Sequence, residues 1–368
     1  MPNASGGRDA GQLADSMCEH TGTHSVPMVS VIVPCRDEVQ SIEGCMKSLL
    51  AVTYPKDRLE VLVVDGMSKD GTRDIVTAYA HKHAFIRLVD NPKRVTPNAL
   101  NIGINNARGD IIMLLGAHAA FAPDSISKCV EAIGKSEADC VGGIIVTLPA
   151  DARPMAEAIA IALSHPFGVG NAYFRIGALK PRWVDTVPFG CYKREVFDRI
   201  GMFDEELVRN QDDEFNLRLI KRGGRIRLLP EVVSYYYARD SLLKLWRMYY
   251  QYGYFKPLVA QKVGGIMTVR QVIPAACVLS ALVMGPLALW SLTSRTLLMA
   301  AVLTYALFVV CCSFVAGLRR GLTCALSLSL VFPVLHVSYG LGYLIGMLQC
   351  LLVRRGQRRH DVVFPITR

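Results

Sequence analysis

Short apolar runs alternate with amphipathic stretches through the first part of the chain. Four runs have the length and the β-branched content of buried strands, at residues 29–34, 61–64, 86–89 and 111–115. The stretch after the first run has apolar residues at helical spacing, at Ile42, Cys45 and Leu49. This alternation predicts an α/β domain with a mostly parallel, doubly wound sheet, which we place at residues 28–238. Residues 1–27 are polar and lack an apolar core, so we expect them to be disordered.

The last part of the chain is apolar enough to enter a membrane. Residues 272–353 contain no Asp, Glu or Lys, and their only charges are Arg295, Arg319 and Arg320. Those arginines divide the region into three uncharged runs.

Each of these runs reaches the length of a membrane helix, for which about 20 apolar residues are needed. Runs 272–292 and 296–318 have the length to cross once. Run 321–353 contains Pro333 and several glycines, and it fits a kinked helix, a tight hairpin or a re-entrant pair. We therefore expect residues 271–353 to form three or four membrane helices, or two helices and a re-entrant hairpin.

Basic residues flank the apolar runs unevenly. Arg319, Arg320 and the basic tail 354–368 should face the cytoplasm, because cytoplasmic flanks are enriched in Lys and Arg. The turn at Arg295 then faces out. We expect a multi-pass protein of the cytoplasmic membrane with its large N-terminal domain in the cytoplasm.

Residues 239–270 connect the domain to the first apolar run. Trp246 and Tyr249 share one helical face, with Lys244 and Arg247 on the other. A basic amphipathic helix rich in Trp and Tyr is typical of a membrane interface, so we expect these residues to lie there. The alternative is a helix that covers the edge of the sheet.

The net charge of the chain indicates which kind of binding partner to expect. The chain has 41 Lys and Arg against 31 Asp and Glu, a formal charge of +10. Outside residues 244–256, no basic stripe with interleaved aromatics precedes the apolar part, so we expect anionic lipid and a phosphate-rich substrate rather than nucleic acid. The eleven cysteines have no framework spacing and fit reduced thiols.

Polar residues follow the predicted strands at the edge where such sheets bind ligands. Arg36 and Glu38 follow the first strand, Asp65 the second and His118 the fourth. The chain has neither a Gly-x-Gly-x-x-Gly motif nor a P-loop, so a nucleotide would be held by side chains and loop backbone. Asp65 could accept a hydrogen bond from a base, and Arg94 is placed for phosphate.

Three successive carboxylates stand before a helix-like stretch, at Asp212, Asp213 and Glu214. Like charges this close raise one another's pKa, which makes a carboxylate a usable base near neutral pH. The alternative is an acidic helix N-terminus that complements the helix dipole.

Several motifs together carry a resemblance to a known family. In order and spacing, the chain resembles family 2 glycosyltransferases with the GT-A fold, and within them the ExoA-type glucosyltransferases of succinoglycan biosynthesis. The resemblance covers roughly residues 29–257. The motifs that carry it are residues 29–38, 64–72, 99–103, 107–110, 166–171, 184–190, 210–218 and 249–253.

The resemblance implies a role for each candidate residue. Asp212 would be the general base that takes a proton from the acceptor hydroxyl, assisted by Asp213 and Glu214, and the anomeric carbon would invert. The implied donor-binding residues are Pro34, Arg36, Glu38, Asp65, Arg94 and Asn101. The implied acceptor-binding residues are Trp183, Asp185, Phe189 and Arg218, of which Trp183 and Phe189 could equally belong to the core.

The sequence departs from the family at its metal motif. A carboxylate should begin the motif after the fourth strand, but the chain reads Gly116-Ala117-His118. Mg²⁺ or Mn²⁺ normally offsets the charge of the leaving diphosphate, and a lone imidazole is a poor site for a hard cation. Three alternatives remain: His118 holds metal together with donor phosphates and water, cationic side chains replace the metal, or activity has been lost.

The expected function is transfer of a hexose, glucose from UDP-glucose, to a polyprenyl-diphosphate-linked oligosaccharide in bacterial exopolysaccharide synthesis. A processive polysaccharide synthase is the alternative among enzymes. An inactive sugar-nucleotide-binding membrane subunit is the alternative that Gly116 suggests. A membrane scaffold without a donor site would leave Arg36, Glu38, Asp65 and Asp212 unexplained.

Overall fold

The computed structural model describes residues 26–265 and 268–353. Disorder was expected for residues 1–27, of which residues 1–25 lie outside the described residues, as does the tail 354–368. The first half contains the predicted alternation of strands and helices. Its elements are β1 (Val29–Cys35), α2 (Ile42–Ala51), η1 (Lys56–Arg58), β2 (Leu59–Asp65), α3 (Thr72–Lys82), β3 (Ile86–Asp90), α4 (Thr96–Asn106) and β4 (Ile111–Leu114).

The second half of the domain returns to the same sheet. Its elements are β5 (Ala119–Phe121), α5 (Ser125–Lys135), β6 (Cys140–Leu148), α6 (Pro154–Ala162), α7 (Pro166–Val169), α8 (Tyr173–Ile176), β7 (Arg182–Trp183), β8 (Cys191–Lys193), α9 (Glu195–Ile200), α10 (Gln211–Lys221) and β9 (Ile226–Tyr237). The strand order is β3-β2-β1-β4-β8-β6-β9-β5, with β7 on β9. β1 to β4 pair in parallel, as predicted, and β6 is parallel to β9. β8, β5 and β7 are antiparallel to their neighbours, so the complete sheet is mixed.

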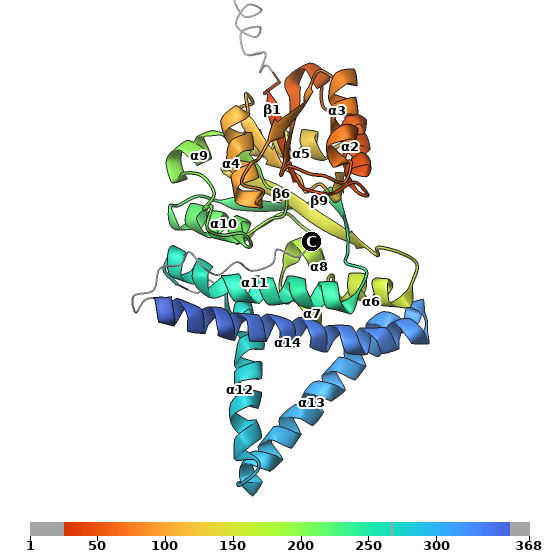
Figure 1. Cartoon of the computed structure of the whole chain (residues 1–368), viewed down its shortest axis with the longest axis vertical. Helices are drawn as coiled ribbons and strands as arrows, with labels where there is room; N and C mark the ends of the chain where they lie inside the picture. Colours follow the sequence, from red (N-terminus) through yellow and green to blue (C-terminus); the bar gives the residue numbers. More distant parts are fainter. Residues whose placement is uncertain (1–25, 266–267, 354–368) are drawn as a thin grey trace, which may run out of the picture.

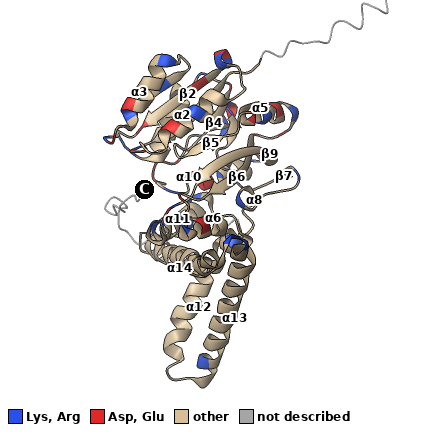
Figure 2. Cartoon of the chain, turned by 90° about the vertical axis from the view of Figure 1, so that its right-hand side faces the viewer, with Lys and Arg blue, Asp and Glu red and all other residues tan. Residues whose placement is uncertain are grey.

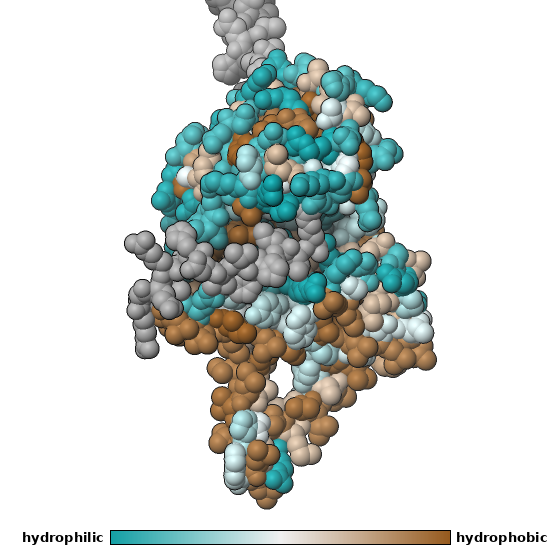
Figure 3. All heavy atoms as spheres, viewed as in Figure 1, coloured by the Kyte–Doolittle hydropathy of each residue, from teal (hydrophilic) through white to brown (hydrophobic). Residues whose placement is uncertain are grey.

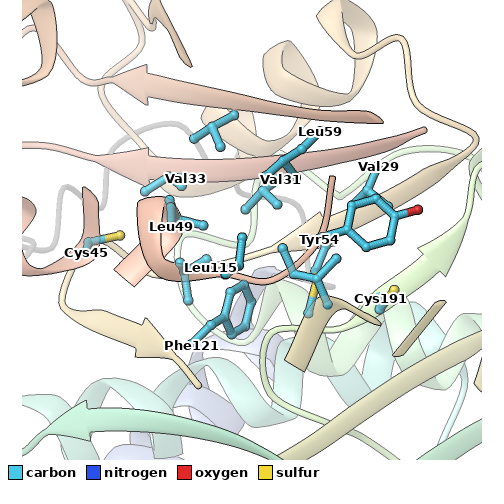
Figure 4. Close-up of a cluster of buried hydrophobic side chains, with 14 of the residues drawn as sticks. Val29, Val31, Val33, Cys45, Leu49, Tyr54, Leu59, Leu115, Phe121 and Cys191 are labelled. Carbon is cyan, nitrogen blue, oxygen red and sulfur yellow. The ribbon is translucent and has the colours of Figure 1, made fainter. Parts of the chain in front are cut away.

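Both faces of the sheet are covered. β1 and β2 are buried almost throughout, which explains their uninterrupted apolar runs. Alternate residues of β1 enter different cores: Val31 and Val33 pack with Leu49 and Phe121 on one face (Figure 4), and Ile32 packs with α4 and α10 on the other. The loops after the strands therefore meet at one edge of a rigid sheet.

The C-terminal part forms a layer and a protruding hairpin. Its elements are α11 (Leu242–Val263), η2 (Val269–Gln271), α12 (Ile273–Leu287), α13 (Leu292–Gly317), η3 (Leu318–Arg320) and α14 (Leu322–Val353). α11 and α14 lie side by side beneath the α/β domain, and α12 and α13 point away from it (Figure 1). Leu245 and Met248 of α11 are buried in a cluster that includes Leu328 and Leu335 of α14.

Two of the described helices are long and apolar enough to cross a membrane, α13 with η3 and α14. α12 has only 15 residues. The multi-pass arrangement expected from the sequence is therefore not supported by helix length and composition. Residues 321–353, for which three arrangements were open, contain one helix of 32 residues with Pro333 inside it.

Candidate active site

The loops after β1 and β2 are tied together around Asp65. This carboxylate is fully buried and accepts hydrogen bonds from the Ser68 amide at 2.9 Å and from Arg73 Nη1 at 2.8 Å. Burial acts to raise the pKa of Asp65, but the Ser68 hydrogen bonds and the Arg73 guanidinium outweigh it, so the pKa lies below its ordinary value. Arg73, which the sequence did not single out, also binds Asp90 at 2.8 Å.

Arg36 and Arg94 lie at this edge of the sheet as well. Arg36 follows Pro34 and Cys35 at the end of β1; its side chain packs on Gly66, and its Nη1 lies 3.5 Å from the Arg94 carbonyl oxygen. Arg94 is exposed and has a left-handed backbone, with a φ of 63°. The structure thus gathers the predicted donor-binding residues from the first three strands.

Asn101 is an exception among the predicted donor-binding residues. Its amide nitrogen donates to the Phe203 carbonyl oxygen at 2.9 Å, and its oxygen accepts from the Phe203 amide at 3.0 Å. The side chain is buried. It fixes α4 to the segment after α9 rather than reaching toward a diphosphate, because both ends of its amide are used within the domain.

His118 faces Glu38 across the strand ends. Its Nδ1 lies 3.7 Å from Glu38 Oε1, and its ring meets the Tyr236 ring edge-on at 5.3 Å. Burial acts to raise the pKa of Glu38, but the interactions with His118 and Ser41 lower it below its ordinary value. A recess of about 350 Å³ opens beside Glu38 and is also lined by Asp70, Arg239 and Lys244.

Gly116 occupies the first position of the metal motif. A Cβ placed there would lie 3.3 Å from the ring of Phe189, which has a left-handed φ of 47°. Phe189 therefore packs beside the motif and also against the core. This position is compatible with either predicted role, that of an acceptor-binding residue or that of a core residue.

The protein supplies only part of a cation site here. Across residues 26–265 and 268–353, no three His, Cys, Asp or Glu side chains come together in a way that could hold a metal ion. His118 and Glu38 offer one imidazole and one carboxylate, whereas Mg²⁺ takes six ligands, mostly oxygen. The pair fits a divalent cation only if donor phosphate oxygens and water complete the coordination shell.

Asp212 lies in the first turn of α10, above α11. Asn210 precedes the helix in a left-handed conformation, with a φ of 59°, and its side chain donates to the Tyr252 carbonyl oxygen of α11 at 2.8 Å. The Asp212 side chain is open to water, yet protein surrounds it at longer range. That desolvation, together with the charge of Asp213, raises its pKa from 3.8 to about 6.

The two neighbouring carboxylates have partners of their own. Asp213 forms a close ion pair with Lys256 of α11, and the Lys256 charge acts to lower the pKa of Asp212. Lys256 was missed by sequence reasoning, because nothing in its local pattern sets it apart from the other basic residues of α11. Arg218 binds Glu214 at 2.7 Å.

Arg218 has further partners within the domain. Its guanidinium also donates to the Ile200 and Met202 carbonyl oxygens, so it joins α10 to the loop after α9. Glu214 is buried against it. The donors of Arg218 are used inside the domain, and its binding of an acceptor stays a prediction.

The remaining predicted acceptor residues lie at the sheet edge and beside the hairpin. Trp183 is 46% exposed, with the Arg225 guanidinium carbon 4.0 Å from its ring centre. Asp185 is bound by Arg270 at 2.7 Å, just before α12. These positions leave Trp183 open to a ligand and make Asp185 a link to the hairpin.

The mixed sheet, the carboxylates after its strands and the raised pKa of Asp212 agree with the class of nucleotide-sugar transferases that have the GT-A fold. The family model described as glycosyl transferase family 2 matches residues 30–201. The chain belongs to this family.

Two curated relatives extend the match beyond the family model. One is a dolichyl N-acetyl-alpha-D-glucosaminyl phosphate 3-beta-D-2,3-diacetamido-2,3-dideoxy-beta-D-glucuronosyltransferase of Methanococcus voltae, 34% identical over 64% of this chain and 74% of the relative. The succinoglycan biosynthesis protein ExoA of Rhizobium meliloti is 28% identical over 70% of this chain and 76% of the relative.

A solved structure has the same fold. The mannosyltransferase PcManGT of Pyrobaculum calidifontis matches with a TM-score of 0.55 at 22% identity, covering 89% of this chain and 88% of that one. The predicted GT-A fold is thereby confirmed.

Proposed function

We propose that this protein is an inverting, membrane-bound hexosyltransferase that moves glucose from UDP-glucose to a polyprenyl-diphosphate-linked oligosaccharide in bacterial exopolysaccharide synthesis. The observation that carries the proposal is Asp212: a water-accessible carboxylate with a pKa of about 6, at the start of a helix fixed to the sheet. A base of this pKa is ionised at neutral pH and still basic enough to take a proton from a sugar hydroxyl as it attacks.

The donor would lie along the strand ends, with its nucleotide near Asp65 and Pro34 and its diphosphate toward Arg36 and Arg94. A divalent cation, Mg²⁺ or Mn²⁺, would be held by His118 and Glu38 with the donor phosphates, and it would offset the charge of the leaving group. The Pyrobaculum relative was solved in complex with GDP-Man and Mn²⁺, which supports this assignment.

The acceptor is assigned from its relatives and from the place of the base. The Methanococcus relative is named for a dolichyl-phosphate-linked sugar, and the Rhizobium relative for succinoglycan biosynthesis. Asp212 stands directly above the α11–α14 layer, so an acceptor sugar carried on a lipid would approach it from that side.

The test is transfer of labelled glucose by the purified full chain in lipid, with a lipid extract from its source as acceptor. Asp212→Asn keeps the shape of the side chain and removes the base, so transfer should fall by about 10²–10⁴-fold while the far-UV circular dichroism spectrum stays the same. Full activity of Asp212→Asn would refute its role. UDP-N-acetylglucosamine and GDP-mannose, tested in parallel, decide the donor.

The same experiment decides the alternatives. A long polymer in place of a single transferred sugar would indicate a processive synthase. Binding of UDP-glucose by calorimetry without transfer would indicate the inactive subunit, which Gly116 suggests.

A further inference from the structure

α14 is as apolar as a membrane span, yet it is attached to the rest of the protein along its whole length. Just before its start, Arg320 binds Glu157 at 3.1 Å. In its middle, His336 Nε2 lies 2.7 Å from the Phe167 carbonyl oxygen. Near its end, Gln349 forms a close hydrogen bond with Tyr254 of α11. The axis of α14 must therefore follow the underside of the catalytic domain, as Figure 1 shows.

The contact between α14 and α11 is unusually close. A Cβ at Gly342 or Gly346 would overlap the carbonyl oxygen of Tyr250 or Tyr254, and one at Gly253 would overlap that of Tyr339. Small residues that let two helix backbones approach in this way fix the crossing geometry. α14 cannot turn away from α11 without losing this interface.

α11 is in turn fixed to the catalytic domain. Lys256 pairs with Asp213, and Lys262 binds Asp204 at 2.6 Å. The visible surface of the domain above it is mostly hydrophilic with a few apolar patches, whereas apolar residues dominate the surface from the level of α14 downward (Figure 3). If α14 crossed a bilayer, this polar domain would have to enter the hydrocarbon core with it, at a large cost.

The outer side of α14 is a line of bare apolar side chains. Leu326, Val337 and Leu348 are 53%, 37% and 56% exposed. Each of these residues follows the one before it by 11 positions, about three helical turns, so the three side chains point in one direction. From the first to the last they span about 33 Å of the helix. The opposite side of the helix, with Leu328 and Leu335, is buried.

The α12–α13 hairpin has the opposite character. Only 11% of the apolar window of α13 is buried inside the protein, compared with 44% for α14. The helices rise about 22 Å and 39 Å by the usual 1.5 Å per residue, against a hydrocarbon core of about 30 Å. Figure 2 shows the hairpin free of charge except near its turn.

The ends of the hairpin carry the side chains of a membrane–water interface. Trp290, 80% exposed, and Arg295 lie at the turn. Arg270, Arg319 and Arg320 lie at the base. Arg270 is paired with Asp185 and Arg320 with Glu157, whereas Arg319 is exposed at the level expected for anionic lipid headgroups.

We propose that the α12–α13 hairpin alone enters the hydrocarbon core of the bilayer. α14 lies in the plane of the interface, with Leu326, Val337 and Leu348 toward the lipid. This inference rests on the proposed membrane-bound function and specifies how the enzyme meets the membrane. It assigns α14, not α11, as the interfacial helix, and it holds Asp212 at a fixed height above the headgroups.

The depth of single tryptophans tests this directly. Trp183, Trp246 and Trp290 are changed to Phe, and Leu326→Trp, Val337→Trp or Leu348→Trp is added in turn. The full chain is reconstituted in phosphatidylcholine vesicles with bromine at defined acyl positions, and fluorescence quenching gives the depth. We expect all three positions at one shallow depth.

A spanning α14 would give a different profile. Val337→Trp would then lie near the bilayer centre, with the other two near its surfaces, and the proposal would be overturned. Absence of quenching at all three positions would also overturn it, because α14 would not touch lipid.

α13 provides the matched control. Leu292, Leu303 and Val315 are 73%, 64% and 78% exposed, and tryptophans there should be deepest at Leu303. Equal shallow depths along α13 would overturn the insertion of the hairpin. Circular dichroism checks that each variant folds, and Leu330→Trp, one turn away and 57% exposed, replaces Leu326→Trp if that variant does not. Glucose transfer is measured on the unchanged chain, because Trp183 is a predicted acceptor-binding residue. This depth profile together with no transfer by the unchanged chain would refute the proposed function and leave this inference standing.

Discussion

The raised pKa of Asp212 predicts how the rate of glucose transfer depends on pH. With a pKa of about 6, Asp212 is about 90% ionised at pH 7 and about 10% at pH 5. A general base acts in its ionised form, so kcat/KM should fall about tenfold between these pH values. With the ordinary pKa of 3.8, more than about 90% would stay ionised at pH 5, and the rate would hardly change.

This fall in kcat/KM is the acidic limb of the pH–rate profile. Two substitutions should move the limb in opposite directions along the pH axis. Asp213→Asn removes the charge that raises the pKa of Asp212, so the limb should move to lower pH. Lys256→Met removes the charge that lowers it, so the limb should move to higher pH. An interaction of about 1 kcal/mol, that of two unit charges 4 Å apart in water, corresponds to about 0.7 of a pKa unit, which sets the size of each shift.

These variants form a matched pair, because both break the same ion pair and remove opposite charges. The assay is the initial rate of labelled glucose transfer at low donor concentration between pH 4.5 and 8. His118→Gln is a control at the proposed metal site, and because His118 is not among the groups that shift the pKa of Asp212, it should leave the limb in place. Shifts of both variants in one direction, or no limb at pH 6, would refute the electrostatic reasoning.

Two further predictions follow from glycine positions. Gly342→Ala should destabilise the protein by about 1–3 kcal/mol, because its Cβ would overlap the Tyr250 carbonyl oxygen; the thermal midpoint in detergent should fall, whereas Gly285→Ala, with open space around it, should not lower it. Gly116→Asp adds a carboxylate beside His118, so transfer should depend more strongly on Mn²⁺ in an EDTA titration; unchanged dependence in this variant and in His118→Ala would show that the metal site lies elsewhere.

Part of the candidate site could be predicted because its residues follow recognisable patterns. Arg36, Asp65 and His118 stand after apolar strands, and parallel strands place such positions at one edge. Asp212 stands in a run of carboxylates at a helix start. The partners of these residues could not be predicted, because Lys256 and Arg73 meet them through packing between elements.

The partners of Asn101 and Arg218 could not be predicted from the sequence either. Their residue types suit a diphosphate or a sugar, and their motif positions match the family. Their side chains are instead occupied by backbone groups of residues 200–203, which the fold brings beside them.

By itself, the sequence determined the α/β alternation, the acidic segment at Asp212 and the apolar character of residues 272–353, because each depends on local spacing and composition. The tertiary structure decided which carboxylate has a raised pKa, since this depends on Asp213, Lys256 and the surrounding protein. It also decided the direction of α14: hydropathy measures only whether a helix tolerates lipid, whereas close contacts with α11 and the catalytic domain fix how that helix lies.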